Sequence, residues 1–178
     1  MQSNFLLAFC LIAAVSVPVS RAHGVITSVE GANGQTGSAF GMVESTPRDG
    51  TRTNPFQTDS SIIRDREVSS GKASACGRTL AGGNNDIASD MSSGGGPYSC
   101  EVDTTATGDN FKKMNIDTNV PGKNSRSRAK ATEFPLVATM PAGATCTGGA
   151  DGQTCLVRCR NAANAGPFGG CVAVTQAN

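Results

Sequence analysis

The chain of 178 residues is poor in the side chains that build large cores and binding platforms. It has no tryptophan, one tyrosine and one histidine, and charged residues make up only 16% of it. A carbohydrate-binding module is therefore disfavoured, because such modules need exposed aromatic side chains. A nucleic-acid partner is also disfavoured, because the chain after residue 22 carries equal numbers of basic and acidic residues and so has no basic excess.

Long hydrophobic runs are missing after residue 22, so no transmembrane segment is expected there. The apolar run at residues 5–15 is shorter than the about 20 residues that span a bilayer, and it is typical of a signal peptide. Pro18 follows this run, and Ser20 and Ala22 supply small residues before a cleavage point. We predict that residues 1–22 are a removable signal peptide and that residues 23–178 form a single secreted, extracellular β domain. A buried N-terminal helix is the alternative.

Cysteine is plentiful by comparison. Cys10 belongs to the predicted signal peptide, which leaves an even number of cysteines: Cys76, Cys100, Cys146, Cys155, Cys159 and Cys171. In a secreted chain this number predicts three disulfides, whose pairing the spacing leaves open. A zinc site is the rival interpretation, but the chain has neither a Cys-x-x-Cys pair nor a second histidine.

Short β-branched and aromatic runs between Gly- and Pro-rich turns predict a mainly β domain, stapled by disulfides and rich in long loops. Strands are expected at residues 23–29, 98–104, 111–120, 134–140, 155–160 and 170–175. This spacing is typical of a β-sandwich. In the run 155–159 the two-residue period places Val157 beside both cysteines on the buried face and turns Arg158 outward.

The sole histidine, His23, becomes the first residue after the predicted cleavage. An N-terminal histidine offers its α-amino group and its imidazole to one metal ion, and nitrogen ligands suit Cu(II). His23 is therefore the candidate copper ligand, and Asp86 or Asp90 could supply an oxygen ligand to a metal bound there, although nothing in the sequence requires it. A histidine brace needs a second histidine, which the chain does not have, so we predict no catalytic residues and no certain cofactor. The alternative is that His23 simply follows the cleavage point.

Two other sets of charged residues suggest possible functions. Asp86 with Asp90, and Glu101 with Asp103, are pairs of carboxylates of the kind that cleave glycosides, although a solvated strand face is the simpler interpretation of the second pair. A basic stretch could meet an anionic wall polymer or a membrane surface, but a solvated loop fits the neutral net charge better. That stretch consists of Lys112, Lys113, Lys123, Arg126, Arg128 and Lys130.

Several segments, in order along the chain, resemble the fungal appressorium-specific secreted proteins, known as the MAS or Egh-like family. They are residues 23–26, 45–57, 76–80, 83–86, 96–100, 119–122, 134–136, 155–161 and 165–172. The resemblance implies a secreted fungal protein linked to appressorium formation and host penetration. More distantly, the start at a histidine resembles the copper-dependent lytic polysaccharide monooxygenases, which implies an immunoglobulin-like sandwich.

The chain departs from the family pattern before Gly96-Pro97-Tyr98, where the members compared carry a longer segment that includes a histidine. We therefore predict a short, non-enzymatic, virulence-associated member with an immunoglobulin-like β-sandwich. Its expected partner is a host surface or a component of the fungal cell wall. The alternative function is a copper-binding protein that uses His23. The sequence leaves the oligomeric state open.

Overall fold

The computed structural model describes residues 24–31, 36–47, 58–80, 82–85, 97–125 and 134–176. This part of the chain is mainly β, as predicted, and carries a short helix, α1 (Asp65–Ser69). The strands are β1 (Val29–Glu30), β2 (Thr36–Gly37), β3 (Ser61–Ile62), β4 (Arg78–Thr79), β5 (Gly83–Asn84), β6 (Tyr98–Asp103), β7 (Lys112–Lys113), β8 (Asn115–Thr118), β9 (Val137–Thr139), β10 (Thr154–Asn161) and β11 (Phe168–Thr175).

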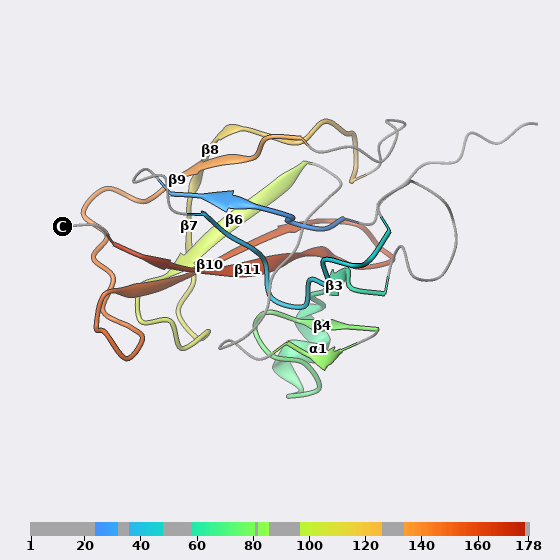
Figure 1. Ribbon diagram of the computed structural model, residues 1–178, viewed down its shortest axis with the longest axis horizontal. Helices are drawn as coiled ribbons and strands as arrows, with labels where there is room; N and C mark the ends of the chain where they lie inside the picture. The colour runs from blue at the N-terminus through green and yellow to red at the C-terminus, as the bar shows by residue number, and fades with distance from the viewer. Residues whose placement is uncertain are drawn as a thin grey trace, which may run out of the picture.

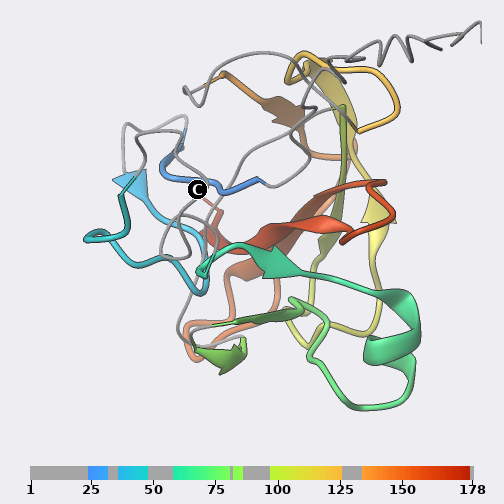
Figure 2. The same cartoon turned by 90° about the vertical axis from the view of Figure 1, so that its right-hand side faces the viewer.

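Most strands belong to one antiparallel sheet with the order β5-β4-β3-β11-β10-β6-β7. Its centre is the long pair β10 and β11, flanked by β6. Two small antiparallel sheets, β1-β2 and β8-β9, complete the described fold. Figures 1 and 2 both place β9 on one side of the β10–β11 pair and α1 on the other.

One face of the central strands forms the apolar core. Val157 pairs with Val102 and Cys159 pairs with Cys100, so strand alternation brings these side chains to the same face. Ile116 of β8 and Ala138 of β9 pack against the same buried cluster. The small β8-β9 sheet therefore covers the apolar face of the large sheet. The finer expectation of an immunoglobulin-like strand arrangement stays a prediction.

The expected strands are right at the centre of the fold and too long at its periphery. Those at 98–104, 155–160 and 170–175 correspond to β6, β10 and β11. The expected strand at 111–120 divides because β7 pairs with β6 whereas β8 pairs with β9, so the chain changes sheet between them. In the part of 23–29 that the structure describes, Val29 is the first residue of β1 and Val25 makes an isolated bridge.

The helix α1 is too short to be stable by itself and is held by contacts of its side chains with other parts of the fold. Asp65 and Glu67 lie in its first turn, where negative charge suits the helix dipole. Asp65 pairs with Arg160 of β10, and Glu67 pairs with Arg78 of β4. The described residues contain no helix with the length and apolar character needed to cross a membrane.

Candidate functional site

The predicted three disulfides are formed, and the structure supplies their pairing. Cys76 bonds to Cys171, Cys100 to Cys159, and Cys146 to Cys155. All six cysteines are buried. Each disulfide has one end on β10 or β11, so the staples fix the two central strands to segments 95, 59 and 9 residues away in the chain.

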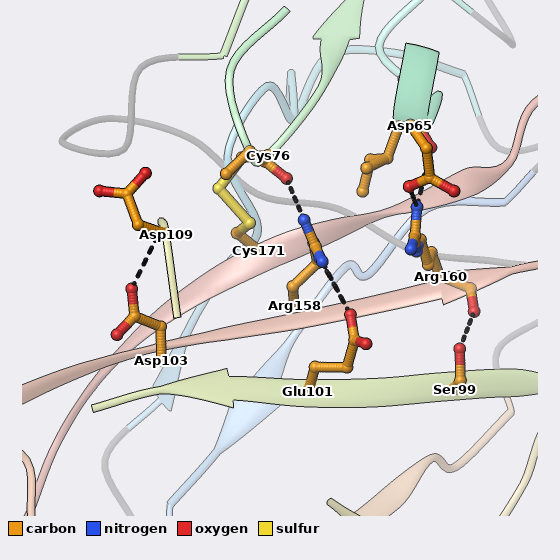
Figure 3. A network of polar contacts seen from close by, with 11 residues as sticks. Asp65, Cys76, Ser99, Glu101, Asp103, Asp109, Arg158, Arg160 and Cys171 are labelled. Atoms are coloured by element: carbon orange, nitrogen blue, oxygen red, sulfur yellow. Dashed lines mark hydrogen bonds and ion pairs between the residues drawn. A yellow bond between two sulfur atoms is a disulfide. The ribbon is translucent and has the colours of Figure 1, made fainter. Parts of the chain in front are cut away.

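The second face of the large sheet carries several charged side chains beside the buried Leu156 and Cys171, and Arg158 of β10 lies in its middle (Figure 3). Nη2 and Nε of Arg158 donate to Oε2 of Glu101 on β6 at 2.8 and 3.3 Å, and Nη1 donates to the carbonyl oxygen of Ala75 at 3.1 Å. The guanidinium also stacks over the ring of Phe111, 3.8 Å from its centroid. The prediction that Arg158 points into solvent is wrong: the residue is only 9% exposed, because Phe111 and the segment before Cys76 cover this face.

A second ionic cluster joins α1 to its surroundings. Glu67 accepts hydrogen bonds from Arg64 Nη1 at 2.8 Å and from Arg78 Nε at 2.9 Å. These hydrogen bonds, that of Arg64 first, lower the pKa of Glu67 to about 2. Arg64 also donates to the carbonyl oxygens of Gly166 at 3.0 Å and Ala165 at 2.9 Å. The cluster therefore ties α1, β4 and the loop before β11 together.

Asp103, at the end of β6, organises the turn that follows it. Its Oδ1 accepts from the amide and hydroxyl of Thr105 at 2.9 and 2.7 Å. Its Oδ2 accepts from the hydroxyl of Thr107 at 3.2 Å and from the amides of Gly108 and Asp109 at 2.7 and 3.2 Å. Burial raises the pKa of Asp103, but the hydrogen bonds from Thr105 and Gly108 outweigh it and hold the pKa at about 2.

These contacts decide the alternatives for Glu101 and Asp103. The expectation of a solvated strand face is wrong, because Asp103 is fully buried and Glu101 is only partly exposed beside Arg158. The glycosidase alternative gains nothing either. The oxygens of Asp103 are occupied by hydrogen-bond donors, and a pKa of about 2 keeps the carboxyl ionised, which does not suit a general acid. Both carboxylates stabilise the fold.

A buried polar cluster lies where the segment 45–57, one of those that resemble the appressorium family, joins the fold. Oδ2 of Asp59 accepts from the amide of Val43 at 3.0 Å, so residues before and after this segment are tied together. Asn85 donates through Nδ2 to the hydroxyl of Ser61 and to the carbonyl oxygen of Cys76, both at 2.9 Å. Asp59, Ser61 and Asn85 are all buried.

Several predicted site residues lie outside the described residues: His23, Asp86 and Asp90, and the end of the basic stretch at Arg126, Arg128 and Lys130. Within the described ranges, no three histidine, cysteine or acidic side chains come together as a metal site would require. Gly24 and Ile26, one and three residues after His23, are buried. Lys112 and Lys113 form β7 at the edge of the large sheet, and both are exposed.

The polar anchors of the fold were missed from the sequence. The side-chain amide of Asn119 accepts from the amide of Tyr98 and donates to its carbonyl oxygen, both at 2.8 Å. Asn161 accepts from the amides of Ala163 and Phe168, both at 3.1 Å. Asparagine is so common in turns and at the ends of strands that its residue type alone gives no signal of such contacts.

Comparison with known proteins shows what this chain is similar to. A family model described as Egh16-like virulence factor matches residues 21–93 and 90–169. The appressoria-specific virulence factor GAS1 of Pyricularia oryzae (strain 70-15) is 40% identical over 208 aligned residues, which cover 99% of this chain and 80% of the relative. GAS2 of the same fungus, also described as an appressoria-specific virulence factor, is 32% identical over 255 aligned residues, covering 93% and 87%.

No solved structure matches the chain significantly. The family match, by contrast, extends over most of the chain and includes five of the six disulfide-bonded cysteines, and Cys171 lies two residues beyond its end. The chain belongs to the Egh16-like family of virulence factors.

Proposed function

We propose that this protein is a secreted, non-enzymatic protein of the fungal appressorium that acts at the host surface or at the fungal cell wall during penetration. Its 40% identity with the appressoria-specific virulence factor GAS1 supports the link to the appressorium. Its three disulfides support an extracellular location, because disulfides persist in oxidising compartments.

The buried charged groups are paired within the fold, and this observation carries the proposal that the protein is non-enzymatic. Arg158 is paired with Glu101, and Asp103 is enclosed by the turn that it organises. Glu67 is held between two arginines. These groups have their hydrogen bonds satisfied by the fold, as expected of a scaffold whose surface rather than a reaction centre meets the partner.

Complementation tests the proposed role. A Pyricularia oryzae strain that lacks GAS1 would receive this chain, complete or without residues 1–22, and penetration of host tissue would be scored. We expect the complete chain to restore penetration at least in part and the chain without residues 1–22 to fail. Equal rescue by both forms would argue against secretion. Failure of the complete chain, once detected outside the appressorium, would argue against the shared role.

A second candidate function is copper binding at a processed N-terminus. The supporting observation is that Gly24 and Ile26 are buried, so the chain directly after His23 is packed into the fold. The α-amino group and imidazole of His23 would be the ligands, and both release their protons near neutral pH. The site would bind one Cu(II) ion and would not by itself provide a second histidine.

The copper hypothesis is tested on protein that begins at His23. Calorimetry with Cu(II) alone should give sub-micromolar affinity, and the electron paramagnetic resonance spectrum should show nitrogen ligands. The matched control carries one extra residue before His23, which removes the free α-amino group at that position. Binding that is equal in both forms, or no binding, would eliminate this function and leave the surface role.

A further inference from the structure

The connection between β5 and β6 contains the break in the match to the family model. The two segments matched by the family model meet at residues 90–93. The alignment with GAS1 extends over 208 positions, more than the 178 residues of the whole chain, so part of the relative lies opposite a gap. The longer alignment shows that the relative has sequence that this chain does not have, and the break in the family match places a missing block between Asn85 and Tyr98.

Both ends of this connection are anchored by residues outside it. The amide of Asn85 donates to the carbonyl oxygen of Gly77 at 2.9 Å, and its side chain bonds to Ser61 and Cys76. The main-chain amide and carbonyl oxygen of Tyr98 both bond to the side chain of Asn119. The chain is therefore fixed where it leaves β5 and where it enters β6, with no contribution from a longer block.

The short connection is long enough to join these strands. β5 is the end strand of the large sheet, and four strands separate it from β6. At about 4.8 Å per strand spacing the lateral distance is roughly 24 Å, and a shift by the whole length of a strand raises it to roughly 30 Å. Residues 86–97 reach up to roughly 40 Å when extended. Curvature of the sheet only shortens the distance to be covered.

The hydrophobic core and the set of three disulfides are also complete without the block. The six cysteines pair with one another, and none is left for a partner in a missing segment. The main core cluster draws its buried side chains from residues on both sides of the connection, from Ile26 to Val172. We infer that the missing block is a separable module and that this chain folds into the stapled β domain without it, so the connection 86–97 is a natural insertion point.

Three chains test this inference. The complete chain would be secreted from a fungal host beside a chimera that carries the corresponding block of GAS1 between Asn85 and Tyr98. The matched control carries a Gly/Ser linker of the same length at that point. Disulfides would be mapped by mass spectrometry after proteolysis, and unfolding would be followed by circular dichroism.

We expect the same three disulfides and a single cooperative transition in all three proteins. The linker chimera should melt only about 2–4 °C below the short chain, because lengthening a surface loop adds little closure entropy. Mixed disulfides or non-cooperative melting of the short chain would overturn the inference, whether or not the chimeras fold. If the GAS1 chimera folds whereas the short chain and the linker chimera do not, the block is part of the core. These readouts do not depend on the proposed role in virulence.

Discussion

Arg158 is buried, although its position in the strand pattern predicts exposure to solvent. Its guanidinium is buried between Glu101, the Ala75 carbonyl and the Phe111 ring. Replacing Arg158 by Ala would leave Glu101 partly buried without its cation, and losing one partner of a buried pair is costly. We expect Arg158→Ala to lower the free energy of unfolding by about 2–4 kcal/mol in urea titrations, and Arg158→Lys to lower it less.

The matched control for this prediction is Lys72→Ala, since Lys72 is an exposed cation on the loop after α1. Surface substitutions of this kind change stability by about 0.5 kcal/mol or less. If Arg158→Ala costs no more than Lys72→Ala, the contacts with Glu101 and Phe111 contribute nothing beyond surface charge.

Asp103 gives the protein a predictable acid sensitivity. Its pKa of about 2 in the folded protein lies below the ordinary value of 3.8, so folding favours the ionised form. The resulting stability is fully present above about pH 4 and is lost as the pH falls from there through 2. At 1.36 kcal/mol per pKa unit it amounts to roughly 2 kcal/mol.

The variant Asp103→Asn checks this prediction by urea titration at pH 5 and pH 2. An amide keeps a single acceptor oxygen and carries no charge, so the variant should be less stable than the parent at pH 5. The gap between the two proteins should narrow by roughly 2 kcal/mol at pH 2. A gap that is independent of pH would show that Asp103 acts through shape alone.

Strand alternation correctly assigns Val157 and Arg158 to opposite faces, because a pleated strand forces that alternation. It cannot tell that the second face is covered, because the cover comes from Phe111 and from the segment that Cys76 fixes to Cys171. The contact between Asn119 and Tyr98, which are 21 residues apart, is of the same long-range kind.

At the scale of elements, the strands that pack on the core were predicted well, whereas the very short strands were not. β6, β10 and β11 each pack an apolar face on the core, so they leave a period-two pattern in the sequence. β1, β4 and β5 are two residues long and are specified by their pairing partners. A run of two residues has no periodicity to read.

The disulfides differ in the lengths of chain that they constrain. Cys76–Cys171 joins residues 95 apart and fixes the segment before β4 to β11, whereas Cys146–Cys155 joins residues 9 apart. By the chain-entropy estimate the first contributes about 4–5 kcal/mol and the second about 2–3 kcal/mol. Two double Cys→Ser variants, one at Cys76 and Cys171 and one at Cys146 and Cys155, can be compared in urea titrations. The first should be less stable than the second by about 2 kcal/mol.

The comparison between the two variants serves as its own control, because each replaces two buried sulfurs by two hydroxyls. The cost of that replacement largely cancels in the difference. The reverse order of stability would show that the short loop is needed for native packing around β10, and that unfolded-state entropy is the smaller effect.

For the whole molecule, stability should decrease outward from the pair β10–β11. These strands pair along most of their length, and every disulfide ends on one of them. The β1-β2 sheet has two paired residues in each strand, and its residues are exposed or only partly buried. Strands with few buried contacts open by local fluctuation, whereas central strands open only when the whole domain unfolds.

Hydrogen exchange measured by mass spectrometry tests this order. We expect peptides from β10 and β11 to exchange only through global unfolding and peptides from β1-β2 to exchange through local opening, at rates at least 100-fold faster. Destabilising the protein by Arg158→Ala should accelerate exchange in β10 in proportion to the loss of global stability and leave β1-β2 unchanged. Equal protection in the two regions would mean that the domain opens as one unit, with the small sheet as much a part of the cooperative core as the stapled pair.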